Sequence, residues 1–181
     1  MKNEIRNSDY YVNLLTLPYE EACEVLKKRH GELEKDYTTE KRFEHFKKMN
    51  PEDIRTESAI DDRIHPFPGF VVHHIMENQY LNLSSKKSIS REKPPYSTQK
   101  KENLVLCDPI EHFILHYLIA KETNGEFGWQ GAQSIFGNTK NFYKKFIDET
   151  LKDVLNEIES QSCLEDVEIN KMRKKYENGE Y

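Results

Sequence analysis

The fold of this chain depends on two short stretches: residues 70–75 read FVVHHI, and residues 103–116 read NLVLCDPIEHFILH. Both contain aliphatic or aromatic runs that favour β-strands, and the second continues past Asp-Pro with helical spacing. Asp108 suits a helix N-cap, and Pro109 suits the first turn because the N–H that proline lacks would have no intrahelical partner there. The sequence therefore predicts a strand, a connection, a second strand, and a helix that runs to about Lys121.

Helical patterns flank these stretches on both sides. Pro18 suits the first turn of a helix that ends at Gly31, and a second helix is expected over residues 39–49. Beyond the central stretches, apolar side chains recur at helical spacing over residues 142–158. We therefore predict the α+β class, as a mostly helical chain around a short antiparallel hairpin packed on a helix.

Length and composition set limits on the organisation of the chain. It has 181 residues, of which 36% are hydrophobic and 33% charged, so we expect one small-core domain with helical additions. The expected regions are an N-terminal helical region (1–60), a core (61–122), and a C-terminal helical region (123–181). The C-terminal region is expected to pack on the same domain.

Charge and cysteine content exclude several classes of protein. The formal net charge of −5 excludes a uniformly basic, DNA-coating protein. Three cysteines with no CxxC pair exclude a disulfide framework and a cysteine zinc ribbon, which favours a reducing compartment. Residues 1–10 contain no apolar run, and the most apolar stretch, residues 113–120, is too short to span a membrane. We expect a cytoplasmic protein with no membrane partner, of unknown oligomeric state.

Four of the seven histidines fall in two pairs. His73 and His74 are adjacent at the end of the first predicted strand. His112 and His116 are four residues apart on the predicted helix, so their imidazoles lie on one face, one turn apart, where they can share a metal ion. The rest of this helix is apolar, so we expect it to be packed on both sides, with the histidines in a buried polar site.

Together these residues resemble the HNH endonuclease family, whose core is the ββα-metal (His-Me) finger. The resemblance covers about residues 70–118, and its specific features are the nine-residue step from the asparagine to the next histidine and the Glu-His at the helix start. The CxxC pairs that brace the finger in part of the family are absent. The matching residues, in order, are His73, His74, Asn103, His112 and His116.

The resemblance implies a metal-dependent enzyme that hydrolyses DNA phosphodiester bonds, with a separate role for each residue. His74 corresponds to the general base, and Asn103 to the residue that holds the finger and orients the base. His73, His112 and His116 correspond to the ligands of one divalent metal ion. Adjacent strand residues point to opposite faces, so His73 and His74 can serve one phosphate only if the strand ends or bulges there.

The identity of the ion is left open. Family members often use magnesium or manganese, whereas three neutral imidazoles suit zinc, nickel or cobalt better than magnesium, which prefers oxygen ligands. An open coordination position would distinguish a catalytic from a structural site.

The connection between the two predicted strands is basic, because residues 86–101 hold six basic side chains and one acid, Glu92. In the family this connection lies near the substrate, so its cations are expected to bind DNA phosphates. A solvated lysine-rich loop is the alternative interpretation. The predicted nucleic-acid-binding residues are Lys86, Lys87, Arg91, Lys93, Lys100 and Lys101.

Two other functions are compatible with the sequence. A non-catalytic nucleic-acid-binding module with a structural metal would use four imidazoles, those of His73, His74, His112 and His116, to close a tetrahedral site. A helical interaction protein without metal would simply pack these histidines. The number of protein ligands distinguishes the module with a structural metal from a nuclease. The metal content of the purified protein distinguishes the metal-free interaction protein from both.

Overall fold

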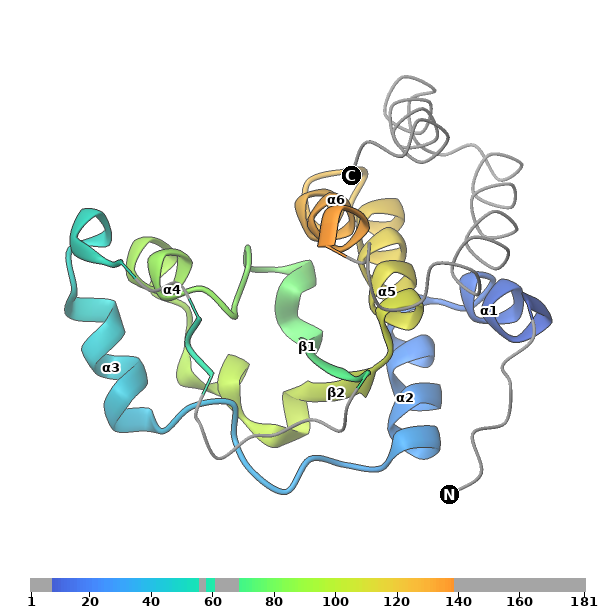
Figure 1. Cartoon of the computed structure of the whole chain (residues 1–181), viewed down its shortest axis with the longest axis horizontal. Helices are drawn as coiled ribbons and strands as arrows, with labels where there is room; N and C mark the ends of the chain where they lie inside the picture. Colours follow the sequence, from blue (N-terminus) through green and yellow to red (C-terminus); the bar gives the residue numbers. More distant parts are fainter. Residues whose placement is uncertain (1–7, 56–57, 61–68, 139–181) are drawn as a thin grey trace. The chain divides into compact units, whose positions relative to one another are not determined.

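The computed structural model describes residues 8–55, 58–60 and 69–138 (Figure 1). In these ranges the chain forms helices and one two-stranded antiparallel sheet, which confirms the α+β class. The α-helices are α1 (Ser8–Leu15), α2 (Tyr19–His30), α3 (Glu40–Lys48), α4 (Lys86–Glu92), α5 (Pro109–Glu122) and α6 (Trp129–Asn138). The strands are β1 (Val71–His74) and β2 (Leu104–Cys107), and the short 3-10 helices are η1 (Pro51–Asp53), η2 (Ile75–Asn78), η3 (Tyr96–Gln99) and η4 (Lys101–Asn103). The predicted helix over residues 142–158 lies outside the described residues.

The chain divides into two compact units, and the boundaries differ from those of the three regions expected from the sequence. One unit contains Met1–Ala22 with Pro109–Tyr181, and the other contains Cys23–Asp108. The three expected regions follow the order of the chain, whereas the first unit joins two segments that are far apart in sequence.

Helix α5 is the centre of the first unit, where α1 and α6 pack against it. From Ile110 to Ala120 every side chain except that of His112 is buried, as expected for a helix packed on both sides. Asn124 and Gly125 both have positive φ just beyond its end, and Gly125 N–H donates to the carbonyl of Ala120 at 2.8 Å. Asparagine and glycine adopt this left-handed conformation at low cost, so the helix stops where the sequence predicts.

The second unit has a core of aromatic and aliphatic side chains contributed by α3, α4 and β2. The Thr39 hydroxyl caps α3 by accepting the Arg42 N–H at 3.4 Å, and Phe43 and Phe46 are buried. The core cluster consists of Tyr37, Phe43, Phe46, Ala59, Ile89 and Leu104. In the sheet, His73 pairs with Val105 and His74 pairs with Leu104.

Helix α4 lies in the basic segment that the sequence analysis treated as a polar connection or solvated loop. The Ser85 hydroxyl caps it by accepting the Ser88 N–H at 3.4 Å, and Lys93 ends it in the left-handed conformation. The helix has little apolar periodicity of its own. It forms because Ile89 is fully buried in the core cluster, since packing rather than propensity stabilises most short helices.

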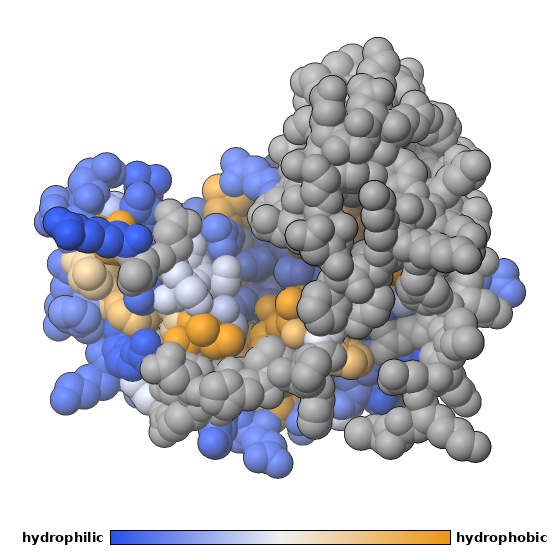
Figure 2. All heavy atoms as spheres, viewed as in Figure 1, coloured by the Kyte–Doolittle hydropathy of each residue, from blue (hydrophilic) through white to orange (hydrophobic). Residues whose placement is uncertain are grey.

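The surface seen in Figure 2 is mostly hydrophilic over α3 and α4, with small apolar areas between. Among the described residues, no helix combines the length and the apolar character that crossing a membrane requires.

Candidate metal centre

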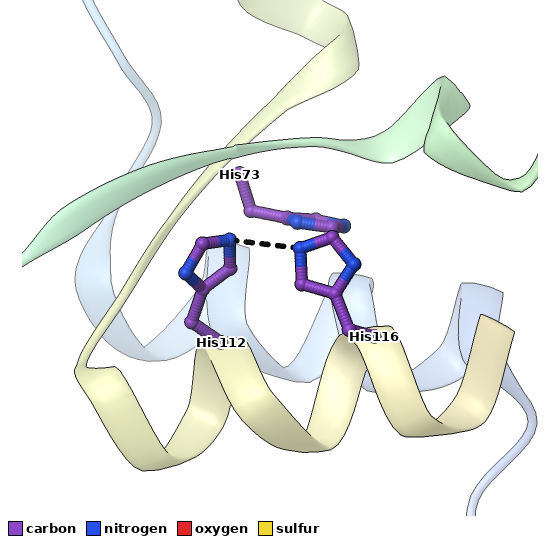
Figure 3. Close-up of side chains that lie close together, drawn as sticks. All are labelled: His73, His112 and His116. Atoms are coloured by element: carbon purple, nitrogen blue, oxygen red, sulfur yellow. Dashed lines mark hydrogen bonds between the residues drawn. The ribbon is translucent and has the colours of Figure 1, made fainter. Parts of the chain in front are cut away.

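His112 and His116 lie one turn apart on α5, with their imidazoles side by side (Figure 3). Their Nε2 atoms are 3.2 Å apart. Two nitrogen ligands on a tetrahedral zinc ion, each at 2.0–2.1 Å, would be separated by about 3.3 Å. The spacing of the pair therefore matches that of two ligands of one small divalent ion.

His73, on β1, completes a group of three imidazoles (Figure 3). Each of the three residues offers one ring nitrogen, and these atoms all lie within 4.8 Å of one another. His73 and His116 are buried, and His112 is half-buried. These three histidines are the ligands predicted from the sequence, and the group could hold a metal ion.

Burial makes His116 a neutral imidazole. Its removal from water penalises the charged form and lowers the pKa of the ring to about 4. A neutral imidazole keeps a nitrogen lone pair at neutral pH, which is the form that binds metal ions. The environment of His116 therefore suits a ligand.

The backbone of α6 lies directly against the His116 ring. A Cβ atom added at Gly131 would lie 2.2 Å from His116 Cε1 and 2.3 Å from His116 Nδ1. Gly128, just before α6, has a φ of +84°, and a Cβ there would lie 2.3 Å from the His116 carbonyl oxygen. Only glycine allows this close approach, so α6 helps to hold the imidazole in place.

His74 lies in a different environment from His73. The two are adjacent in a regularly paired strand, so their side chains point to opposite faces of the sheet. The His74 ring is buried and contacts the Tyr37 ring edge-on, with centroids 4.3 Å apart. The strand ends at His74, which is one of the conditions under which His73 and His74 could serve one phosphate. His74 is nevertheless not a member of the three-histidine group. Its role as a general base stays a prediction.

Asn103 ends η4 immediately before β2. Its side-chain amide donates to the carbonyl of Ser97 at 2.8 Å, and its backbone N–H donates to the carbonyl of Lys100 at 2.8 Å. These bonds tie the end of the basic connection to η3. Whether Asn103 also orients a base stays a prediction.

Several of the predicted DNA-binding cations already contact the protein. Arg91 pairs with Glu52 at 2.9 Å, and the Lys86 ammonium lies 5.4 Å from the centroid of the Phe46 ring. Lys100 pairs with Asp36 at 3.1 Å. Lys87 is half-buried, whereas Lys93 and Lys101 are exposed. Phosphates would have to compete with internal partners at Arg91 and Lys100, so Lys93 and Lys101 are the more accessible of the predicted contacts.

Glu77 follows the His73–His74 pair closely in the chain, and the sequence leaves its role open. Its carboxylate is buried, with Oε1 accepting the Leu83 N–H at 2.8 Å and Oε2 lying 3.9 Å from His73 Nδ1. Burial raises the pKa of this carboxyl to about 7, and the Leu83 hydrogen bond partly offsets the rise. The sequence signal is an acid soon after the histidine pair, a position at which members of the HNH family often carry one, and it does not specify what the carboxylate contacts.

Comparison of the chain with protein-family models, with curated protein sequences and with solved structures found no match in any of the three.

Proposed function

We propose that this protein is a metal-dependent endonuclease that hydrolyses DNA phosphodiester bonds at the three-histidine group. The observation that carries the proposal is the convergence of ring nitrogens from His73, His112 and His116 within 4.8 Å. These residues also occupy the ligand positions of the HNH pattern, which supports the same chemistry.

The residues fit a divalent ion, and their number favours catalysis. Three uncharged nitrogen donors suit zinc, nickel or cobalt better than magnesium or manganese, which prefer oxygen ligands. In the described part of the chain the group has three members rather than the four of a closed structural site, which leaves a coordination position for substrate or water. A bound divalent ion would supply Lewis-acid stabilisation of the negative charge that builds on the phosphate and the leaving oxygen.

The remaining chemistry belongs to the chain's own residues. In this proposal His74 accepts a proton from water as the water oxygen bonds to phosphorus and the bond to the 3′ oxygen breaks. Because the His74 ring is 1% exposed beside Tyr37, water must reach it when DNA binds. The exposed Lys93 and Lys101 would contact flanking phosphates, which makes binding weaker at high salt.

The test is cleavage of supercoiled plasmid by the purified chain with magnesium, manganese, zinc, nickel or cobalt, and with a chelator. We expect nicking that the chelator abolishes, and loss of nicking in both His112→Ala and His74→Ala. His45→Ala is the matched control, because it removes an exposed imidazole of α3 outside the group. Absence of nicking with every ion would contradict the proposal.

The non-catalytic nucleic-acid-binding module is the other outcome of this test. It would bind DNA and hold metal without cutting, and a metal-bound structure would show four protein ligands and no exchangeable water.

A further inference from the structure

The Glu77 carboxylate links the loop after η2 to the β1 histidine of the metal group. One oxygen, Oε1, is held by the Leu83 N–H at 2.8 Å, and the other, Oε2, is the atom near His73, 3.9 Å from Nδ1. Both side chains are withdrawn from solvent, with 0% of the His73 side chain and 10% of the Glu77 side chain exposed. The direction of Oε2 is therefore set by the loop rather than by water.

We propose that Glu77 is a positioning residue. Its Oε2 lies 3.9 Å from His73 Nδ1 in this structure, beyond hydrogen-bond distance, and closes on the Nδ1–H when a metal ion binds, so that Nε2 of the same ring faces the ion. An imidazole ligand binds metal through one nitrogen and carries a proton on the other, so an acceptor beside Nδ1 selects the tautomer with its lone pair on Nε2. The inference rests on the metal site of the proposed function.

Glu77 reaches this position because of where η2 begins. The chain leaves β1 at His74 and turns directly into η2 (Ile75–Asn78), which places residue 77 back beside residue 73. The Leu83 hydrogen bond then closes the following loop onto the same carboxylate. Glu77 thus acts on the metal only through His73, as an outer partner of a ligand.

Substitution by glutamine separates the two contacts of Glu77. The glutamine amide oxygen can still accept the Leu83 N–H, so the loop keeps its anchor. The amide NH₂ that replaces Oε2 is a donor, and it would face the Nδ1–H of His73 without forming a hydrogen bond. Glu77→Gln therefore removes the positioning contact while conserving the shape and the structural contact.

Glu92, the last residue of α4, offers a matched control that contacts the same loop. Its Oε2 accepts the Leu81 N–H at 2.9 Å, so it also anchors this loop through a carboxylate, but it is exposed. Glu92→Gln makes the same chemical change to the other loop anchor, at a residue with no assigned part in the metal group.

The experiment is a titration of the full chain with Co²⁺, followed by visible absorption, together with competition by Zn²⁺ to obtain affinities. Far-UV circular dichroism of the metal-free proteins checks the fold. We expect Glu77→Gln to weaken metal binding roughly 10–100-fold, as loss of the group that hydrogen-bonds to a metal-ligating histidine does in other metal sites. We also expect it to alter the cobalt spectrum. Glu92→Gln should stay within about threefold of the unchanged protein.

A double-mutant cycle with His73→Ala separates positioning from a general structural effect. If Glu77 acts through His73, then Glu77→Gln causes no further loss of affinity when His73 is already alanine. An equal loss in both backgrounds, or wild-type affinity in Glu77→Gln, would overturn the inference. Failure of the unchanged chain to bind any metal would overturn both this inference and the proposed metal site, whereas metal binding without DNA cleavage would contradict only the proposed activity.

Discussion

The two histidine pairs illustrate how secondary structure decides which side chains meet. On α5, a spacing of four places His112 and His116 on one face, with Nε2 atoms 3.2 Å apart. On β1, a spacing of one sends His73 and His74 to opposite faces, so that only His73 joins the group. One helix thus supplies two candidate ligands, whereas the strand supplies one candidate ligand and one histidine packed against Tyr37.

This difference between helix and strand bears on the ligand and general-base roles proposed for the four histidines. A ligand must be held close to other ligands, which the helix does by its geometry alone. A general base must be near the site without binding the ion. In the proposed function, the alternation of the strand at the end of β1 would provide that separation between His73 and His74.

The largest expected effect comes from removing a member of the helix pair, with removal of His74 from the strand pair as its comparison. His112→Ala should weaken metal binding by more than roughly 100-fold, because the loss of a ligand exceeds the loss of an outer partner. His74→Ala should leave metal affinity within about threefold of the unchanged protein. Isothermal titration with Zn²⁺ measures both values. A large loss of affinity in His74→Ala would identify His74 as a fourth ligand and favour the structural-metal alternative.

A smaller effect is expected from the glycine that lies against the helix pair. Alanine at a helical glycine usually stabilises a helix by about 0.5–1 kcal/mol. At Gly131 the added methyl group would overlap the His116 ring, so we expect a net destabilisation of about 1–3 kcal/mol and weaker metal binding. Urea unfolding of the metal-free protein measures the change in stability, and metal titration measures the change in metal affinity.

Gln130→Ala is the control for this substitution, because it raises helix propensity at an exposed position of α6 next to Gly131. It should leave both stability and metal affinity nearly unchanged. Full stability and full metal affinity in Gly131→Ala would show that α6 does not position His116.

The smallest effect concerns Asp36, the residue before Tyr37, whose ring contacts that of His74. Burial alone would raise the pKa of the Asp36 carboxyl, but hydrogen bonds from the Lys101 backbone, Lys100 and Tyr96 lower it below the ordinary value of 3.8. Because the folded-state pKa is the lower one, this stabilisation is present above about pH 3.8 and is lost as the pH falls through the folded pKa.

Asp36→Asn should therefore cost under about 1 kcal/mol at pH 7, a small value because the site is partly exposed to solvent. The difference in unfolding free energy from the unchanged protein should shrink as the pH falls below 3.8. Urea unfolding at a series of pH values measures it. A difference that stays constant down to acidic pH would mean that the carboxylate charge plays no part.

The elements that could be predicted are those with a strong local pattern. The apolar stretch with its Asp-Pro start became α5, and the Asn124-Gly125 stop followed it directly. Thr39 and the inward phenylalanines defined α3 in the same way. Helix α4 could not be predicted, because a single buried isoleucine in a tertiary core stabilises a segment whose composition resembles a loop.

The sequence alone determined that His112 and His116 share a face, since residue periodicity fixes which side chains of one helix lie together, and it offered His73 and His74 as the further candidates. Only the tertiary structure decided that His73, and not His74, joins the helix pair, and that Glu77 and Gly131 lie against two of the candidate ligands. The physical reason is that these contacts depend on strand register, on the turn after β1 and on the packing of α6. No local pattern in the chain encodes any of the three.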